Sequence, residues 1–325
     1  MQTVIFGATG YLGSHVAEQL ALAGHTVHCV IRESSDADFL EQLSLRFSHV
    51  SIARIDFSDQ LSLRESITEQ ALVINCVADT RMHLADDERR KVEVGLTTNL
   101  FKAAEAALAK RFLQLSTVMV YGFDRPEEAI DENYPCKPRY SYSRIAVERE
   151  QALMALAKDS ELECVILRPS NTLGKRDSSV LPSVLQAHEK GMFAVIGGGA
   201  WHYSCIDARD VGRAMVHLLT VPVTQTEVFL VKAYDMTWLD LKEQLDTLLD
   251  RPSRLFNMPR CLAMAMGRFL AAIYPYGSNP ALTPFTVSVL STHTLFDDSK
   301  IRATGFQPKY HLTETLQDAL VIQNN

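Results

Sequence analysis

The sequence predicts an α/β fold in which a doubly wound parallel sheet is followed by a smaller C-terminal domain. Three observations support this prediction. Short apolar runs alternate with helical patterns through the first half of the 325-residue chain. Three glycines follow the first apolar run directly, and no internal repeat or long linker breaks the alternation. Regular alternation of strands and helices places parallel strands side by side and covers both faces of the sheet.

Six runs of strand-like composition follow one another along the chain. They cover residues 2–6, 26–31, 51–55, 72–77, 112–115 and 163–167. Between the first two runs, Val16, Leu20 and Ala23 recur at helical spacing, which predicts a helix over residues 14–23. A longer helix is predicted over residues 88–109. This order of elements is typical of repeated βαβ units.

The junction between the first strand and the first helix reads FGATGYLG. Gly7 can adopt the angles of a sharp turn, Gly10 has no side chain to hold a pyrophosphate away, and Gly13 lets helix and strand pack closely. Amides at the positive end of the helix would then face the phosphates. Such glycines can be purely structural, but their place in a βαβ unit favours a dinucleotide site. The predicted cofactor contacts in this turn are Gly7, Thr9, Gly10, Tyr11, Leu12 and Gly13.

The spacing GxxGxxG resembles the short-chain dehydrogenase/reductase family, and GATGYLG resembles its extended, epimerase/dehydratase-like branch. This resemblance implies a Rossmann fold that binds a nicotinamide dinucleotide. In such folds an acidic residue at the end of the second strand binds the ribose hydroxyl, whereas a basic residue accepts a 2′-phosphate. Here Ile31 stands at the acidic position and Arg32 follows. NADP(H) is therefore the expected cofactor; NAD(H) stays compatible, because Arg32 also suits a solvated surface position.

Two further segments resemble the family's cofactor contacts. Asp56 and Phe57 close the third strand, where the family has an aspartate that contacts the adenine. Cys76, Val77 and Ala78 resemble the small-residue turn that passes under the cofactor. Both segments are therefore predicted to bind the dinucleotide.

The resemblance also implies the catalytic residues. Thr117 lies four residues before the tyrosine of VYG, where the family has a serine or threonine that binds the substrate oxygen. In YSYSR, Tyr140 is at the position of the tyrosine that exchanges a proton with the substrate. The family's lysine four residues later is replaced by Arg144, which keeps the charge but not lysine's compact contact with the ribose hydroxyls. Tyr142 does not fit this pattern, because its partner would be Ala146.

The second half of the chain carries the predicted substrate elements. LRPSNTLG resembles the family's RPxNxYG, so Pro169, Ser170 and Asn171 are predicted to border the nicotinamide and the substrate. The tail, with LTPFTV and FDDSK, resembles the 3β-hydroxysteroid dehydrogenase and dihydroflavonol reductase branch. We expect an NAD(P)-binding Rossmann domain over residues 1–168 and a mainly substrate-binding domain over residues 169–325, partly interleaved with the first. The apolar run 258–273 is too short and interrupted for a transmembrane segment.

Composition narrows the partners and the location. A net charge of −7 without a basic cluster argues against nucleic acid. The six cysteines form no CxxC pair and the histidines lack metal-binding spacing, so we expect free thiols, no metal site and a reducing, cytoplasmic location. The first strand begins at residue 2, so no targeting peptide is expected. The expected partner is a small-molecule substrate, and a homodimer is compatible with the sequence.

The predicted function is hydride transfer between NADP(H) and a secondary alcohol or ketone on a fairly apolar small molecule. The protein would thus be an NAD(P)-dependent oxidoreductase acting on CH–OH groups. Two alternatives stay open. A nucleotide-sugar epimerase or dehydratase shares the scaffold, but it needs a basic clamp for the sugar diphosphate, and the C-terminal third shows none. A cofactor-binding regulator with impaired catalysis is the other, and Arg144 motivates it.

Overall fold

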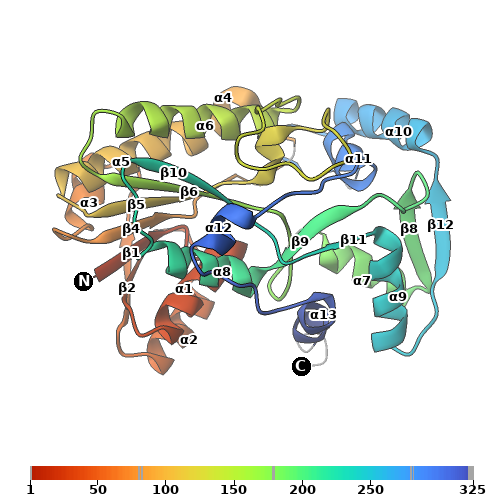
Figure 1. The fold of residues 1–325 in the computed structure, drawn as a ribbon, viewed down its shortest axis with the longest axis horizontal. Helices are drawn as coiled ribbons and strands as arrows, with labels where there is room; N and C mark the ends of the chain where they lie inside the picture. The colour runs from red at the N-terminus through yellow and green to blue at the C-terminus, as the bar shows by residue number, and fades with distance from the viewer. Residues whose placement is uncertain are drawn as a thin grey trace.

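The computed structural model describes residues 2–79, 81, 83–177, 180–278, 280 and 282–320. Its centre is a seven-stranded sheet with the order β10-β6-β5-β4-β1-β2-β3 (Figure 1), in which all neighbouring strands are parallel. The doubly wound α/β architecture predicted from the sequence is confirmed. The strands are β1 (Gln2–Phe6), β2 (Thr26–Arg32), β3 (Val50–Ile55), β4 (Leu72–Asn75), β5 (Arg111–Leu115), β6 (Glu163–Pro169) and β10 (Thr226–Val231).

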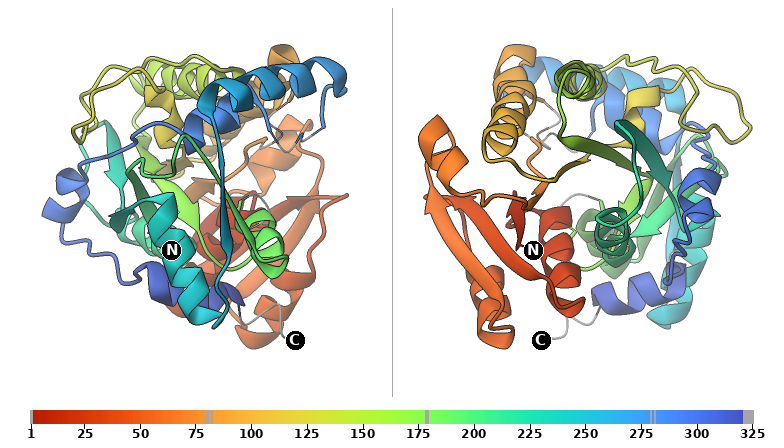
Figure 2. Two further views of the ribbon diagram at one scale, coloured as in Figure 1. Left: turned by 90° about the vertical axis from the view of Figure 1, so that its right-hand side faces the viewer. Right: turned by 60° about the vertical axis from the view of Figure 1, so that its left-hand side comes forward.

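Helices cover both faces of this sheet (Figures 1 and 2). Side chains of a strand alternate between the two faces, so Ile5 joins one core cluster while Val4 and Phe6 join the other. The face of Ile5 is covered by α1 (Tyr11–Leu22), α2 (Asp38–Arg46) and α8 (Ala208–Leu218). The opposite face is covered by α3 (Gln60–Glu65), α5 (Leu96–Ala106) and α6 (Ser141–Ala157).

The helix predicted over residues 88–109 runs as three joined pieces. These are α4 (Asp86–Arg90), a π-helical stretch (Lys91–Gly95) and α5. Arg89 in α4 and Glu93 in the π-helical stretch are both fully buried and paired. Short π-helical stretches inside α-helices are rare and are frequently found at functional sites. The sequence pattern predicted the helix but not this interruption.

The chain after β6 builds a second, smaller unit, yet it also returns to the main sheet through β10. Its small sheets have the orders β11-β9-β7 and β12-β8. They contain β7 (Asn171–Leu173), β8 (Met192–Ile196), β9 (Tyr203–Asp207), β11 (Tyr234–Met236) and β12 (Arg254–Met258). The surrounding helices are α7 (Leu181–Glu189), α9 (Trp238–Leu248), α10 (Arg260–Ile273), α11 (Pro284–Leu290), α12 (Ser299–Ala303) and α13 (Leu312–Leu320).

Three global features complete the description. Across the ranges given above, no helix combines the length and apolar character needed to cross a membrane. In the same ranges, no group of three or more His, Cys, Asp or Glu side chains is arranged to hold a metal ion. All six cysteines are free thiols.

Candidate functional site

The glycine turn lies between β1 and α1, and close backbone packing fixes two of its three glycines. Gly7 has a φ of +82°, and a Cβ there would lie 2.7 Å from the carbonyl carbon of Cys76. A Cβ on Gly13 would lie 2.0 Å from the Gly7 oxygen. Only glycine fits at these two positions. Gly10 differs, because it is exposed and the atom nearest to an added Cβ is 3.4 Å away.

The start of α1 suits an anion. Gly10 is the N-cap, no side chain caps the first turn, and that turn has no acidic residue. The amides and the dipole of this twelve-residue helix therefore point to the open side of the turn. Thr9 is exposed there, while Tyr11 and Leu12 are half-buried. The arrangement fits the diphosphate of a dinucleotide, which backbone amides would hold.

Two arginines lie at the end of β2. Arg32 is the last residue of the strand and is exposed. Arg54, on the neighbouring strand β3, donates from Nη1 to the carbonyl oxygens of Glu33 and Ser35, both at 2.9 Å. Arg54 thus fixes the turn that presents Arg32. The sequence analysis did not single out Arg54, because its place depends on the pairing of β3 with β2.

The other predicted adenine and ribose contacts surround the same end of β1. The Phe57 ring packs edge-on against Phe6 with centroids 5.8 Å apart. Asp56 accepts hydrogen bonds from the Ser58 amide and hydroxyl, both at 2.8 Å, and these lower the pKa of its carboxyl. The Cys76 amide donates to the Phe6 oxygen at 2.9 Å, so the turn 76–78 lies directly against the glycine turn. The fold therefore brings these predicted cofactor contacts to one edge of the sheet.

Thr117 follows β5 and caps a short 3₁₀ helix, Val118–Tyr121, by accepting from the Met119 amide at 3.2 Å. Its hydroxyl also lies close enough to the phenol of Tyr142 to affect the pKa of that phenol. Burial and the charge of Glu93 raise the pKa of Tyr142, and the charge of Arg149, followed by the Thr117 hydroxyl, opposes that rise. The sequence pattern gave Tyr142 no role, yet this is the tyrosine that contacts Thr117.

Tyr140 lies just before α6, as its N-cap, and its phenol oxygen is 2.7 Å from Ser288 Oγ on α11. Ser288 donates its own proton to the Pro284 oxygen at 2.9 Å. Since a hydroxyl has one donor, Tyr140 donates to Ser288 in this arrangement. Its ring contacts Phe123 and Phe285 at centroid distances of 5.8 and 5.6 Å. No hydrogen bond joins Tyr140 to Thr117, both of which lie in the described ranges.

Arg144 lies in the first turns of α6 and is 44% exposed. Its Nη2 donates to Asp86 at 2.8 Å, and its Nη1 donates to the Arg139 oxygen at 2.8 Å. The guanidinium is therefore held on the α4 side of α6 by a carboxylate and a carbonyl. The neighbouring Ser141 hydroxyl and the Arg144 guanidinium lower the pKa of Asp86, which keeps this partner ionised.

A buried ionic group lies beneath Tyr142. The carboxylate of Glu93 accepts from Arg89 at 3.1 Å and from Arg149 at 2.8 Å, and all three side chains are 3% exposed or less. Arg89 also donates to the carbonyl oxygens of Asp79 and Arg81, and its guanidinium lies 5.5 Å from the Tyr142 ring centroid. Sequence reasoning missed this group. The i, i+4 spacing of Arg89 and Glu93 was its one local sign.

The predicted segment after β6 has two different roles. Asn171 donates to the Ser204 oxygen at 3.0 Å and to Thr294 Oγ1 at 3.4 Å, and so ties β7 to β9 and to the C-terminal segment. Ser170, next to Pro169 at the end of β6, has a buried hydroxyl without a hydrogen-bond partner among the described residues. Buried polar groups are normally paired, so Ser170 is the member of this segment with an unmet hydrogen bond.

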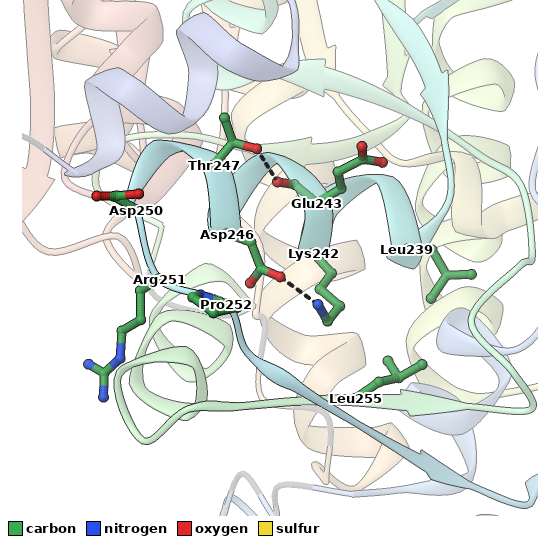
Figure 3. A pocket seen from close by; sticks show the side chains of 9 residues that line it. All are labelled: Leu239, Lys242, Glu243, Asp246, Thr247, Asp250, Arg251, Pro252 and Leu255. Carbon is green, nitrogen blue, oxygen red and sulfur yellow. Dashed lines mark hydrogen bonds and ion pairs between the residues drawn. The ribbon is translucent and has the colours of Figure 1, made fainter.

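A surface hollow elsewhere in the molecule is separate from all of these residues. It lies between α9 and the start of β12, and Figure 3 shows its nine lining side chains. Asp246 in this hollow is already paired, with Lys242 at 2.5 Å and with the Ser253 hydroxyl at 2.7 Å. None of the predicted site residues lines it.

The parallel sheet, the glycine turn and the uncapped helix start define a dinucleotide-binding α/β protein. The chain belongs to the NAD dependent epimerase/dehydratase family, whose sequence model matches residues 3–231. The predicted resemblance to extended short-chain dehydrogenases is confirmed, and a putative dihydroflavonol 4-reductase of Synechocystis (23% identity, 97% of this chain, 92% of that protein) is among the similar proteins.

Related proteins include members of two chemical classes. The UDP-glucose 4-epimerase of Vibrio cholerae is 26% identical and covers 79% of this chain and 78% of its own. A 4-hydroxy-2-methyl-3-oxo-4-farnesyl-3,4-dihydroquinoline-1-oxide ketoreductase of Stigmatella aurantiaca is 25% identical over 94% and 92% of the two chains. A 3beta-hydroxysteroid-dehydrogenase/decarboxylase of Arabidopsis thaliana is 25% identical over 97% and 77%.

Solved structures agree on the fold. A UDP-glucose-4-epimerase of Stenotrophomonas maltophila, with bound NAD and formylated UDP-arabinopyranose, superposes with a TM-score of 0.81. The alignment covers 100% of this chain and 98% of that chain at 18% identity. At this identity the likeness establishes the fold and leaves the substrate open.

Proposed function

We propose that this protein is an NADP(H)-dependent oxidoreductase that interconverts a secondary alcohol and a ketone on a fairly apolar small molecule. The observation that carries this proposal is the surroundings of Tyr140. Its ring lies among the aromatic rings of Phe123 and Phe285, its phenol is hydrogen-bonded to Ser288, and the Arg139 guanidinium lies 5.8 Å from its ring centroid. Apolar walls with few polar anchors are typical of sites for apolar rings or chains.

The proposed mechanism assigns tasks to four residues. When bound, the nicotinamide would supply or accept the hydride. The Thr117 hydroxyl orients the substrate oxygen, and the Tyr140 phenol gives that oxygen a proton during ketone reduction, or takes it back during alcohol oxidation. Ser288 Oγ accepts a hydrogen bond from the Tyr140 phenol, with the two oxygens 2.7 Å apart, and so fixes the orientation of the phenol. Arg144 would stabilise the phenolate by its charge and hold the ribose, for which its guanidinium must turn away from Asp86 and the Arg139 oxygen, each at 2.8 Å.

The cofactor preference rests on the end of β2. Arg32 is exposed there, and Arg54 fixes the Glu33–Ser35 turn through two hydrogen bonds at 2.9 Å. A 2′-phosphate would complete this cationic surface with charge-assisted hydrogen bonds. Glu33 in the same turn weakens the positive field, so the preference depends on Arg32 more than on the net charge of the turn.

The epimerase alternative draws support from the Vibrio cholerae relative, whose name gives a UDP-sugar substrate. Against it stands the pairing of Arg209, a cation at the start of α8. Arg209 donates to Asp207 at 2.7 Å and lies 3.4 Å from Asp318, so it is neutralised within the chain. The regulator alternative draws support from Arg144, because its pairing with Asp86 competes with a ribose contact.

A matched pair of variants tests the mechanism. Tyr140→Phe and Tyr142→Phe each remove one phenol oxygen, two residues apart. Turnover of a panel of alcohols and ketones with NADP(H) should disappear in Tyr140→Phe and persist in Tyr142→Phe, while both bind the cofactor. The reverse result would assign the proton to Tyr142, whose phenol interacts with the Thr117 hydroxyl. No turnover by the unmodified protein with any member of the panel would support the regulator.

Calorimetry tests the substrate class. UDP- and dTDP-sugars should bind the NADP(H)-loaded protein more weakly than millimolar. Micromolar binding of either sugar nucleotide would favour the epimerase or dehydratase instead.

A further inference from the structure

We propose that the outer face of α10 docks this protein on an anionic phospholipid surface. Four large apolar side chains of this helix are solvent-exposed: Leu262 (56%), Met266 (37%), Phe269 (63%) and Ile273 (58%). Their spacing of three or four residues places them on one side of the helix. We call these four residues the α10 face.

The opposite side of α10 is already used for packing. Ala263 and Gly267 are its buried residues, and a Cβ on Gly267 would lie 3.0 Å from the carbonyl carbon of Thr283. These small residues bring α10 close to α11. The helix therefore turns its small residues inward and its large apolar residues outward, the reverse of an ordinary surface helix. Such a face marks a place of contact with another body.

Charge indicates what that body is. The whole chain has a net charge of −7, but residues 251–296 contain four arginines and no lysine, aspartate or glutamate. Arg260 and Arg268 are in α10 itself, and both are exposed. In a symmetric dimer the same patch would face itself, so these arginines would approach like charges. An anionic lipid surface attracts them and accepts the apolar face beside them.

The helix has the dimensions of one that lies on a membrane. Its fourteen residues span about 21 Å, less than the ~30 Å of a bilayer's hydrocarbon core. Figures 1 and 2 show α10 at the outer edge of the molecule. Tyr274 and Tyr276 follow it and are 44% and 74% exposed, and tyrosines are enriched at the membrane–water boundary.

The α10 face is linked through neighbouring segments to the proposed catalytic residues. The carbonyl oxygen of Tyr274 is 3.0 Å from His83 Nε2, and the Tyr276 and His83 rings stack with centroids 4.9 Å apart. The residues that follow α10 therefore contact His83, which precedes α4 in the chain. Behind α10, α11 provides Ser288 and Phe285 to Tyr140. A docked molecule would thus hold its proposed site close to apolar compounds in the bilayer. This last step depends on the proposed function, whereas docking does not.

Vesicle sedimentation with the full-length protein tests the proposal. The vesicles contain phosphatidylcholine alone, or phosphatidylcholine and phosphatidylglycerol in equal parts. The protein should sediment with the mixed vesicles, less so at high salt, and stay in solution with phosphatidylcholine alone. Phe269→Glu should abolish sedimentation. Replacing Arg260 and Arg268 by Gln together should weaken it about 25-fold, at about five-fold for each arginine.

The matched control is Leu45→Glu, which places the same charge on another highly exposed leucine, 88% exposed on α2. It should sediment like the unmodified protein, and thermal melting should show that every variant is folded. The proposal is wrong if the unmodified protein ignores the mixed vesicles, or if Leu45→Glu loses as much binding as Phe269→Glu. It is also wrong if the protein is a dimer that Phe269→Glu dissociates, because the α10 face is then a subunit interface. Vesicle binding without turnover would refute only the proposed function.

Discussion

The glycine turn and the tyrosine segment form the two ends of the proposed site, and they are built in different ways. The turn is made of backbone: Gly7 and Gly13 let main-chain atoms approach, and no side chain caps α1. The tyrosine segment is made of side chains, since Tyr142 rests over the buried Arg89 and Tyr140 is held by Ser288 from another helix. The glycine turn depends on the lack of side chains at Gly7 and Gly13. The tyrosine segment depends on buried charges and hydroxyls that must be paired.

The two constructions predict which substitutions should disrupt each end of the proposed site. A turn built from backbone fails when any side chain is added at a close approach. A cluster built on buried charge fails when one charge is removed, because the remaining charges then lose their partner in a medium that solvates them poorly. The following variants separate these two kinds of failure.

The largest effect is expected at the tyrosine end. Glu93→Gln removes the buried carboxylate that pairs with both Arg89 and Arg149. We expect a loss of about 3–5 kcal/mol in the free energy of unfolding, measured by urea titration. The exposed Glu88 in the preceding turn provides the control, since Glu88→Gln should stay within about 0.5 kcal/mol. Equal stabilities for the two variants would mean that the ionic group does not support this end.

The next largest effect is expected at the glycine turn. Gly13→Ala forces a Cβ to within 2.0 Å of the Gly7 oxygen, and backbone cannot move aside cheaply. It should destabilise the protein by about 3 kcal/mol. Gly10→Ala, whose nearest atom is at 3.4 Å, should leave thermal stability unchanged but weaken dinucleotide binding measured by fluorescence titration. If both variants change thermal stability and dinucleotide binding to the same extent, Gly13 and Gly10 do not have separate roles in packing and in binding.

A pH effect is expected from the first helix. Burial, followed by the charge of Arg176, lowers the pKa of His15 to about 4, and its Nε2 lies 2.7 Å from the Lys175 oxygen. Below about pH 6.5 His15 becomes protonated in the unfolded chain but stays neutral in the folded chain. The free energy of unfolding therefore decreases as the pH is lowered. The loss attributable to His15 between pH 8 and pH 5 should be about 2 kcal/mol. His15→Gln should remove it, whereas the exposed His311→Gln should not.

The cofactor preference gives a smaller effect. Arg32→Ala should weaken NADP(H) binding about ten-fold, or about 1.4 kcal/mol, and leave NAD(H) binding nearly unchanged. Arg46→Ala, an exposed arginine on α2, serves as the matched control. Tighter binding of NAD(H) than of NADP(H) by the unmodified protein would contradict the proposed preference.

The smallest effect is expected at Arg144. Lysine would restore a compact charge that reaches the ribose hydroxyls, so Arg144→Lys should raise turnover about five-fold, or about 1 kcal/mol in the barrier. Asp86→Asn removes the carboxylate that holds the guanidinium at 2.8 Å and should act in the same direction. Unchanged rates in both variants would show that Arg144 does not limit the reaction.

Prediction from the sequence succeeded where the signal was local. The order of strands and helices and the glycine turn follow from short-range patterns. Cys76–Ala78 was predicted from the family resemblance, and it lies beside the glycine turn because β4 pairs with β1. The β4 strand ends at Asn75, two residues before its predicted end, because the Asn75 side chain accepts from the Val77 amide at 3.0 Å and turns the chain. The roles of Tyr140 and Arg144 stay predictions that the variants above address, and the role of Thr117 stays a prediction as well.

The amino-acid sequence alone was enough to predict the scaffold: an alternating α/β chain with a glycine turn at its first junction. These features depend on backbone freedom and on residue periodicity, which act over a few residues. Only the tertiary structure decided that Tyr142 contacts Thr117, that Ser288 reaches Tyr140 across 148 residues, and that α10 turns its large apolar side chains outward. Such contacts depend on which distant segments the folded sheet brings together, and no local pattern of residues specifies that choice.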